Sequence, residues 1–158
     1  MLDTPPGGHL GLDVIVASHV SDVSICISHR EGWELALTER LTRTIINSIV
    51  KPVSQGKTFS YRKYDWLAKS FGPSLEFRPP KLLILEGVGS GQKEVRKFLD
   101  QLIWIDIDEE IGLQRVLHRD GDYLETEMRI WQLREREHFN RDNTRDCATI
   151  RIDGKRFI

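Results

Sequence analysis

KLLILEGVGSG, residues 81–91, is the most informative segment of this 158-residue chain. Residues 82–85 form a short apolar run that ends at a carboxylate, Glu86, and a glycine-rich turn follows. This pattern predicts a buried parallel strand that carries an acid to the carboxyl edge of a sheet, where open α/β folds bind ligands. Glu86 could orient a metal-bound water or a substrate hydroxyl there. The alternative is a strand-terminal carboxylate that accepts backbone N–H bonds from the next turn.

A strand of this type usually accompanies a phosphate-binding loop, G-x-x-x-x-G-K-[ST], nearer the N-terminus. The chain contains no such loop. The turn GVGSG at residues 87–91 is not one either, because no Lys-Ser/Thr pair follows it. The sequence therefore indicates a nucleotide-handling fold that has lost its phosphate-binding loop.

The composition is that of an ordinary soluble globular protein, with 39% hydrophobic and 30% charged residues, and the length predicts one domain. A net charge of −1 gives no argument for a nucleic-acid partner. We find no apolar run near 18 residues and no signal-peptide pattern, so we expect no membrane span and a cytoplasmic location. Cys26 and Cys147 lie in apolar, strand-like stretches and are expected to be buried reduced thiols.

Apolar periodicity divides the chain into alternating elements. Strands are expected at residues 23–27, 82–85, 102–107 and 148–152, and helices at 12–20, 33–50, 92–99, 108–118 and 124–140. Pro52 and Gly56 should end the second helix, and Asp108 should cap the fourth. Residues 58–66 are expected to be extended or loop-like, and residues 73–80 a linker. Strands that alternate with helices predict a parallel α/β sheet.

Arginines are dense around the two late helices, at positions 115, 119, 129, 134, 136, 141 and 145. Arg115 and Arg119 are four residues apart, which places them on one helix face. The planar guanidinium suits phosphate oxygens, and phosphoryl transfer needs positive groups near the transferred phosphate. The alternative is a solvated face. Arg134 and Arg136 alternate with glutamates and are expected to pair with those neighbours.

YRKYDW, residues 61–66, combines aromatic side chains with an acid. Such a cluster could stack a base and accept a hydrogen bond from a sugar hydroxyl. Equally, Tyr64 and Trp66 could cover an edge of the core, as amphipathic aromatic residues often do.

Residues 33–154 resemble the uridine-kinase-like branch of the P-loop nucleoside kinases, as found in actinobacterial ATPases of that type. The matching pieces, in the family's order and with similar spacing, are KPVSQGKTFSYRKYDW (51–66), PPKLLILEGVGSG (79–91), LDQLIWIDIDEEIGLQRVLHRDG (99–121) and REHFNRDNTRDCATIRIDG (136–154). The resemblance implies an α/β, P-loop NTPase-like three-layer fold. It has a five-stranded parallel sheet and a helical lid over residues 115–145, in a single domain spanning residues 1–158.

The resemblance also implies ATP-dependent phosphate transfer to a nucleoside-like hydroxyl, with magnesium. Its expected partners are therefore a nucleotide and a nucleoside-like small molecule. Carried over by position, Tyr64, Asp65 and Trp66 fall in the substrate pocket, and Glu86 lies near magnesium. In the same way, Arg115 and Arg119 are lid arginines on the phosphates, and Arg141 and Arg145 lie near the nucleotide.

The N-terminal part, residues 1–32, departs from the family pattern. Laying DTPPGGHLG (residues 3–11) on the family loop assigns Gly7, Gly8 and Gly11 to the nucleotide site. Leu10 then replaces the lysine, and Gly11 replaces the magnesium-binding hydroxyl. Ser28 stands where the family has the aspartate that serves as base. Losing one charge-stabilising group typically costs about 2.7–4 kcal/mol of barrier, so no intact catalytic set is expected.

Two kinds of function therefore remain open. One is a uridine-kinase-like phosphotransferase with impaired turnover. The other is a non-catalytic pseudokinase that binds a nucleotide or a protein, or a degraded gene product. The family's first strand has no counterpart ahead of Asp3, so we also expect an empty central position in the sheet. Its exposed strand edges would favour a homo-oligomer.

Overall fold

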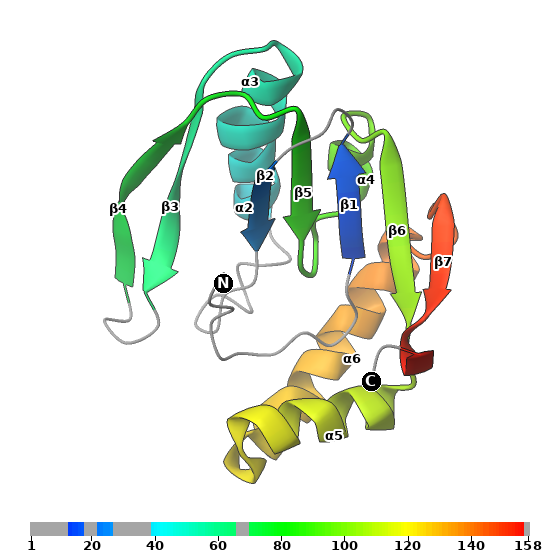
Figure 1. Ribbon diagram of the computed structural model, residues 1–158. Coiled ribbons are helices and arrows are strands. Elements are labelled where there is room, and N and C mark those ends of the chain that lie inside the picture. The colour runs from blue at the N-terminus through cyan, green and yellow to red at the C-terminus, as the bar shows by residue number, and fades with distance from the viewer. Residues whose placement is uncertain (1–12, 18–21, 27–38, 66–69, 157–158) are drawn as a thin grey trace.

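The computed structural model describes residues 13–17, 22–26, 39–65 and 70–156 (Figure 1). These residues form a five-stranded sheet and a separate two-stranded hairpin. In Figure 1, α2 (Glu39–Thr44), α4 (Lys93–Arg96) and α6 (Glu125–Asp142) lie behind the larger sheet. A further helix, α5 (Glu109–Asp120), lies below the lower edge of that sheet.

The larger sheet has the strand order β2-β5-β1-β6-β7. Its strands are β1 (Asp13–Ala17), β2 (Asp22–Cys26), β5 (Leu82–Glu86), β6 (Gln101–Asp106) and β7 (Ile150–Asp153). Strand β2 is parallel to β5, and β6 is parallel to β7. Strand β1 is antiparallel to both of its neighbours, β5 and β6. The predicted parallel sheet is therefore confirmed for four strands, and the fifth runs in the opposite direction.

The central position of the sheet is filled, so the expectation of an empty centre is wrong. The helix expected at residues 12–20 is also wrong, because residues 13–17 form β1. Val14, Ile15 and Val16 are β-branched, which favours a strand over a helix. Ile15 pairs with Leu85 on one side and with Leu102 on the other. The edges of β5 and β6 that face the centre of the sheet thus both pair with β1. This removes the physical reason given above for self-association.

The hairpin consists of β3 (Phe59–Asp65) and β4 (Ser70–Phe77). The linker expected at residues 73–80 is wrong for residues 73–77, which belong to β4 and include Pro73. A two-stranded ribbon has two edge strands, and an edge strand tolerates a residue that has no N–H to donate. The register shifts between Arg62 and Tyr64, and the Arg62 guanidinium donates to the Gly72 and Phe71 carbonyls at 2.8 and 3.0 Å.

The helix that contains α2 continues further than expected. After α2 come a π-helical segment, Ile45–Val50, and helix α3, Lys51–Ser54. Pro52 therefore does not end the helix: it lies in the first turn of α3, where its missing N–H costs little. The chain turns away after α3 at Gly56, whose φ of 66° suits glycine.

The start of α5 agrees with the sequence. The Asp108 carboxylate accepts hydrogen bonds from the backbone N–H groups of Glu110 and Ile111 at 3.0 and 3.3 Å. It thereby satisfies two donors that the first turn of a helix leaves without partners. The predicted cap is confirmed, and it fixes the point at which the chain leaves β6 and turns below the sheet.

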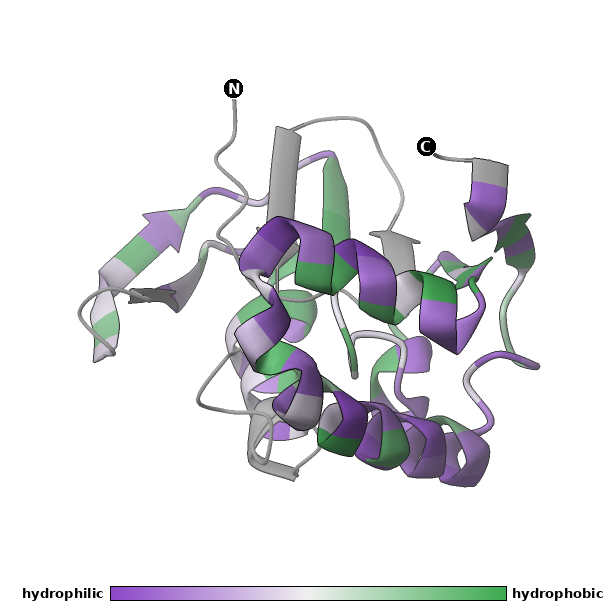
Figure 2. Cartoon of the chain, turned by 90° about the horizontal axis from the view of Figure 1, so that it is seen from below, coloured by the Kyte–Doolittle hydropathy of each residue, from purple (hydrophilic) through white to green (hydrophobic). Residues whose placement is uncertain are grey.

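The hydrophobic core lies between the five-stranded sheet and the helices behind it. On β5 and β6, alternate side chains are buried, and they include Leu83, Leu85 and Leu102. Helical residues such as Leu113 and Met128 complete the same cluster. Figure 2 shows hydrophobic and hydrophilic bands alternating along α5 and α6, as expected for helices with one buried face.

The buried face of α6 includes a histidine, His138, which is 5% exposed. Burial lowers the pKa of His138 below its usual 6.5; Asp142 opposes this shift, while Arg141 and Arg96 add to it. The unfolded chain thus takes up a proton near pH 6.5, whereas the folded protein resists protonation until a lower pH. The resulting stability is fully present above pH 6.5 and is lost as the pH falls below it.

We expect the free energy of unfolding to fall between pH 7.5 and 5.5, and to fall less in His138→Gln. Urea denaturation at both pH values measures this difference. His118→Gln replaces an exposed histidine and is the matched control, with a pH dependence like that of the unmodified chain. An unchanged pH dependence in His138→Gln would contradict the assignment.

Candidate functional site

The carboxyl edge of the sheet gathers the ends of its four parallel strands. Glu86 ends β5, Asp106 ends β6 and Asp153 ends β7. Asp106 pairs in register with Asp153. Because β1 is reversed, the chain enters the sheet at this same edge, through Asp13. Figure 1 shows that α5 faces this edge, which is where ligands bind in open α/β folds.

Glu86 is held at this edge by a compact turn. Gly87 and Gly89 have φ values of 108° and 88°, which favour glycine, and the Ser90 N–H donates to the Gly87 carbonyl at 3.1 Å. The Glu86 side chain is half-buried. Within the part of the chain that the structure describes, it has no hydrogen-bond or ion-pair partner. The alternative of a carboxylate bonded to the N–H groups of the next turn is therefore not observed there.

Arg115 projects from α5 toward the end of β7. Its Nη1 donates to the Gly154 carbonyl at 3.1 Å. Its Nη2 is buried and has no hydrogen-bond partner among the described residues. A buried donor without an acceptor is costly, so this atom suits an acceptor supplied by a ligand.

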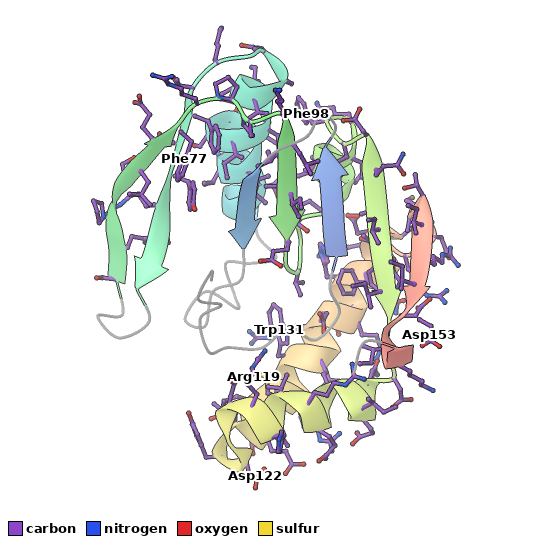
Figure 3. All side chains as sticks on the ribbon, viewed as in Figure 1. Phe77, Phe98, Arg119, Asp122, Trp131 and Asp153 are labelled. Carbon is purple, nitrogen blue, oxygen red and sulfur yellow. The ribbon has the colours of Figure 1, made fainter. Side chains whose placement is uncertain are left out.

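Arg119 lies one turn further along α5. Figure 3 shows Arg119 on the side of α5 that faces the sheet, where Trp131 of α6 also lies. The Arg119 guanidinium donates to both carboxylate oxygens of Asp120, at 2.9 and 2.8 Å. This contact raises the pKa of Arg119, although partial burial opposes the shift. The cation is therefore permanent, but a phosphate would have to compete with Asp120 for it.

Two further arginines have partners that are distant in the sequence. Arg145 donates to both oxygens of Asp106, at 2.7 and 3.1 Å, and this contact is the main cause of a lowered Asp106 pKa. Arg136 pairs with Glu109 of α5. The expectation that Arg136 pairs with its sequence neighbours is therefore wrong, because the closely packed start of α5 supplies the carboxylate. Arg141 is exposed.

The remaining predicted site residues are only partly covered by the structure. Gly7, Gly8, Gly11, Ser28 and Trp66 lie outside the described residues. The backbone of Tyr64 and Asp65 forms the end of β3, without a description of their side chains. Figure 1 shows that β3 ends on the same side of the molecule as the carboxyl edge.

A network of polar groups joins α4 to the end of α6. Arg96 donates to the Asp142 carboxylate at 2.5 Å, and that carboxylate accepts the Lys93 N–H at 2.9 Å. Thr144 is fully buried beside them. Cys147 lies in the turn that follows α6, where it is exposed and has a free thiol. The expectation of a buried Cys147 is wrong, because this residue precedes β7 instead of belonging to it.

Sequence reasoning missed a cleft of about 390 Å³ between β6, α5, α6 and the turn at residues 143–147. Trp104 of β6 and Phe139 of α6 line it, together with Glu109 and Gly112 of α5. The one local signal was Gly112, because glycine in the interior of a helix costs about 1 kcal/mol relative to alanine. The cleft unites residues from distant segments, so no motif could have revealed it.

Over the described ranges, no group of three or more His, Cys, Asp or Glu side chains could by itself hold a metal ion. No described helix is long and apolar enough to cross a membrane.

Comparison with known proteins identifies one family. Residues 39–132, more than half of the chain, match the family described as Phosphoribulokinase / Uridine kinase family. The matched range includes Glu86, Arg115 and Arg119, and it does not include residues 1–38. No curated protein matches the sequence.

Proposed function

Because the chain belongs to the phosphoribulokinase and uridine kinase family, we propose that it binds a nucleotide at the carboxyl edge of its sheet. The observation that carries this proposal is the buried Nη2 of Arg115, which lacks an acceptor among the described residues. A nucleotide supplies such acceptors. Arg119 adds a permanent positive charge one turn away, although it must exchange Asp120 for phosphate.

The ligand we propose is ATP with magnesium. Mg²⁺ is commonly held by one or two carboxylates plus the phosphates of the nucleotide, so a single acid, Glu86, is compatible with such a site. When bound, magnesium would neutralise charge on the phosphates. Tyr64, Asp65 and Trp66 would hold a nucleoside-like substrate. Arg141 and Arg145 would complete the lid, with Arg145 releasing Asp106 to do so.

We further propose that the ancestral reaction, phosphate transfer from ATP to a nucleoside-like hydroxyl, is impaired in this chain. Leu10 cannot neutralise phosphate charge, Gly11 has no side-chain oxygen, and Ser28 is not a carboxylate base. Each lost group is expected to slow turnover by about 10²–10³-fold. The alternative is a pseudokinase that binds a nucleotide or a protein without catalysis, which these same three positions favour.

Thermal denaturation of the purified chain with ATP, with and without magnesium, tests the proposal. At an ATP concentration 100-fold above Kd, binding adds about 2.7 kcal/mol, which raises Tm by about 5–10 °C. We expect a saturable rise that is larger with magnesium and absent in Arg115→Ala. Arg134→Ala is the matched control, because Arg134 is exposed and lies on the other long helix.

A chain that melts cooperatively without any shift would contradict nucleotide binding. A separate assay of ADP formation with nucleosides tests the impairment. Turnover in the ordinary kinase range of about 1–100 s⁻¹ would show that the missing groups have been replaced.

A further inference from the structure

Gly154 lies at the point where the chain leaves the last strand of the sheet. It follows directly on Asp153, the end of β7, which pairs in register with Asp106 at the end of β6. Gly154 is buried, and it begins the short 3₁₀ helix Gly154–Arg156. The register therefore places Gly154 against the end of β6, at the carboxyl edge of the sheet.

The position of Gly154 has no room for a side chain. A methyl group there would lie 2.9 Å from the backbone carbonyl oxygen of Asp106 and 2.9 Å from Cγ2 of Ile105. The backbone oxygen cannot swing aside as the end of a long side chain can, so the segment itself would have to move away from β6. The φ angle of Gly154 lies outside the left-handed region. Glycine is thus needed here for close approach and not for its backbone conformation.

The backbone carbonyl of Gly154 holds the side chain of Arg115, which is 39 residues away in the sequence. Nη1 of Arg115 donates to this carbonyl at 3.1 Å. The guanidinium is planar and rigid, so a contact at one nitrogen restricts the directions in which the other can point. Nη2 is the buried atom without a hydrogen-bond partner among the described residues. The contact that satisfies Nη1 therefore also sets the place of Nη2.

We propose that Gly154 is a positioning residue. Its missing side chain lets its carbonyl approach β6 and hold Arg115 with Nη2 directed at the ligand. Gly154 acts on the ligand only through Arg115. An arginine that is anchored beforehand loses less side-chain freedom when the ligand binds, which favours affinity. The identity of the ligand rests on the proposed nucleotide function, whereas the anchoring of Arg115 does not.

The first test measures the anchoring in the full chain without ligand. The heteronuclear NOE of the Arg115 Nε–Hε group, assigned with Arg115→Lys, reports how rigidly this side chain is held on the ps–ns timescale. We expect a value near those of the backbone amides of α5. In Gly154→Ala it should fall toward the value of Arg78, which is exposed.

The second test measures the affinity for ATP with magnesium by titration. Gly154→Ala should weaken binding about tenfold or more, because a hydrogen bond from a charged donor to the ligand is misplaced. A structural role without positioning would lower the stability of the chain and leave the Arg115 NOE unchanged.

Gly56→Ala is the matched control for both tests. Gly56 follows α3, which lies at the other end of the sheet from the carboxyl edge (Figure 1). A methyl group on Gly56 would meet no other atom within 4 Å among the described residues, although its φ of 66° makes alanine costly. This variant should be less stable, with the Arg115 NOE and the affinity for ATP both unchanged.

An unchanged Arg115 NOE in Gly154→Ala, or an unchanged affinity for ATP despite a lowered NOE, would overturn the positioning role. If the unmodified chain does not bind ATP, the proposed nucleotide function fails, and the NOE alone decides whether Gly154 holds Arg115. If Gly154→Ala fails to fold, the unmodified chain decides. An Arg115 NOE as low as that of Arg78 would then contradict the anchoring, and one as high as that of the backbone would support it.

Discussion

Replacing Leu113 by alanine is expected to lower the free energy of unfolding by about 2–5 kcal/mol. Leu113 is 0% exposed and belongs to the core cluster, on the face of α5 that packs inward. Alanine is at least as good a helix former as leucine, so the loss would come from packing and from the cavity that remains. Urea denaturation followed by circular dichroism measures it.

Leu133→Ala is the matched control for this change. Leu133 lies on α6, where it is 56% exposed. The same substitution there should alter the free energy of unfolding by no more than about 0.5 kcal/mol. Equal losses in the two variants would contradict the placement of α5 against the core.

Asp142→Ala is expected to cost about 3 kcal/mol, at the low end of the range for broken buried pairs. The Asp142 side chain is 8% exposed, and its partner Arg96 is 18% exposed. Removing the carboxylate leaves the Lys93 N–H without its acceptor and the Arg96 charge without its counter-ion, although the backbone carbonyls of Gly91 and Asp142 still accept from Arg96. Because Arg96 is not fully buried, water can relieve part of the cost. Urea denaturation again provides the measurement.

Asp146→Ala, the control for Asp142→Ala, breaks an exposed ion pair with Arg151 instead of a buried one. Those side chains are 62% and 41% exposed, so the expected loss is only about 0–1 kcal/mol. A loss below 1 kcal/mol in Asp142→Ala would mean that the network between α4 and α6 contributes little to stability.

Local signals in the sequence were sufficient for the elements that position the site. Strands β5 and β6 are continuous apolar runs, and Asp108 is followed by two acids at the start of α5. The sequence also predicted that Glu86 ends a strand. Strands β1 and β4 were not predicted from the sequence, and they were recognised only in the tertiary structure. Residues 12–20 have apolar residues at helical spacing, and the β-branched run at residues 14–16 becomes decisive only with the place that β1 takes between β5 and β6.

The same distinction applies to the site residues. Arg115 and Arg119 lie on adjacent turns of one helix, so their position on the same helix face follows from the helical repeat. The partners of Arg136 and Arg145 are 27 and 39 residues away in the sequence. Such pairs depend on how α5, α6 and β6 pack together, which no local pattern encodes. The cleft was not predictable for the same reason.

The reversed central strand has a consequence for the order in which the protein folds. Strands β5 and β6 follow one another in the chain, yet they do not pair, because β1, from a segment more than 60 residues earlier, lies between them. During synthesis β1 leaves the ribosome first but cannot complete its ladder until β6 has emerged. Contacts between distant segments are entropically expensive to close, so insertion of β1 should be a slow step in folding.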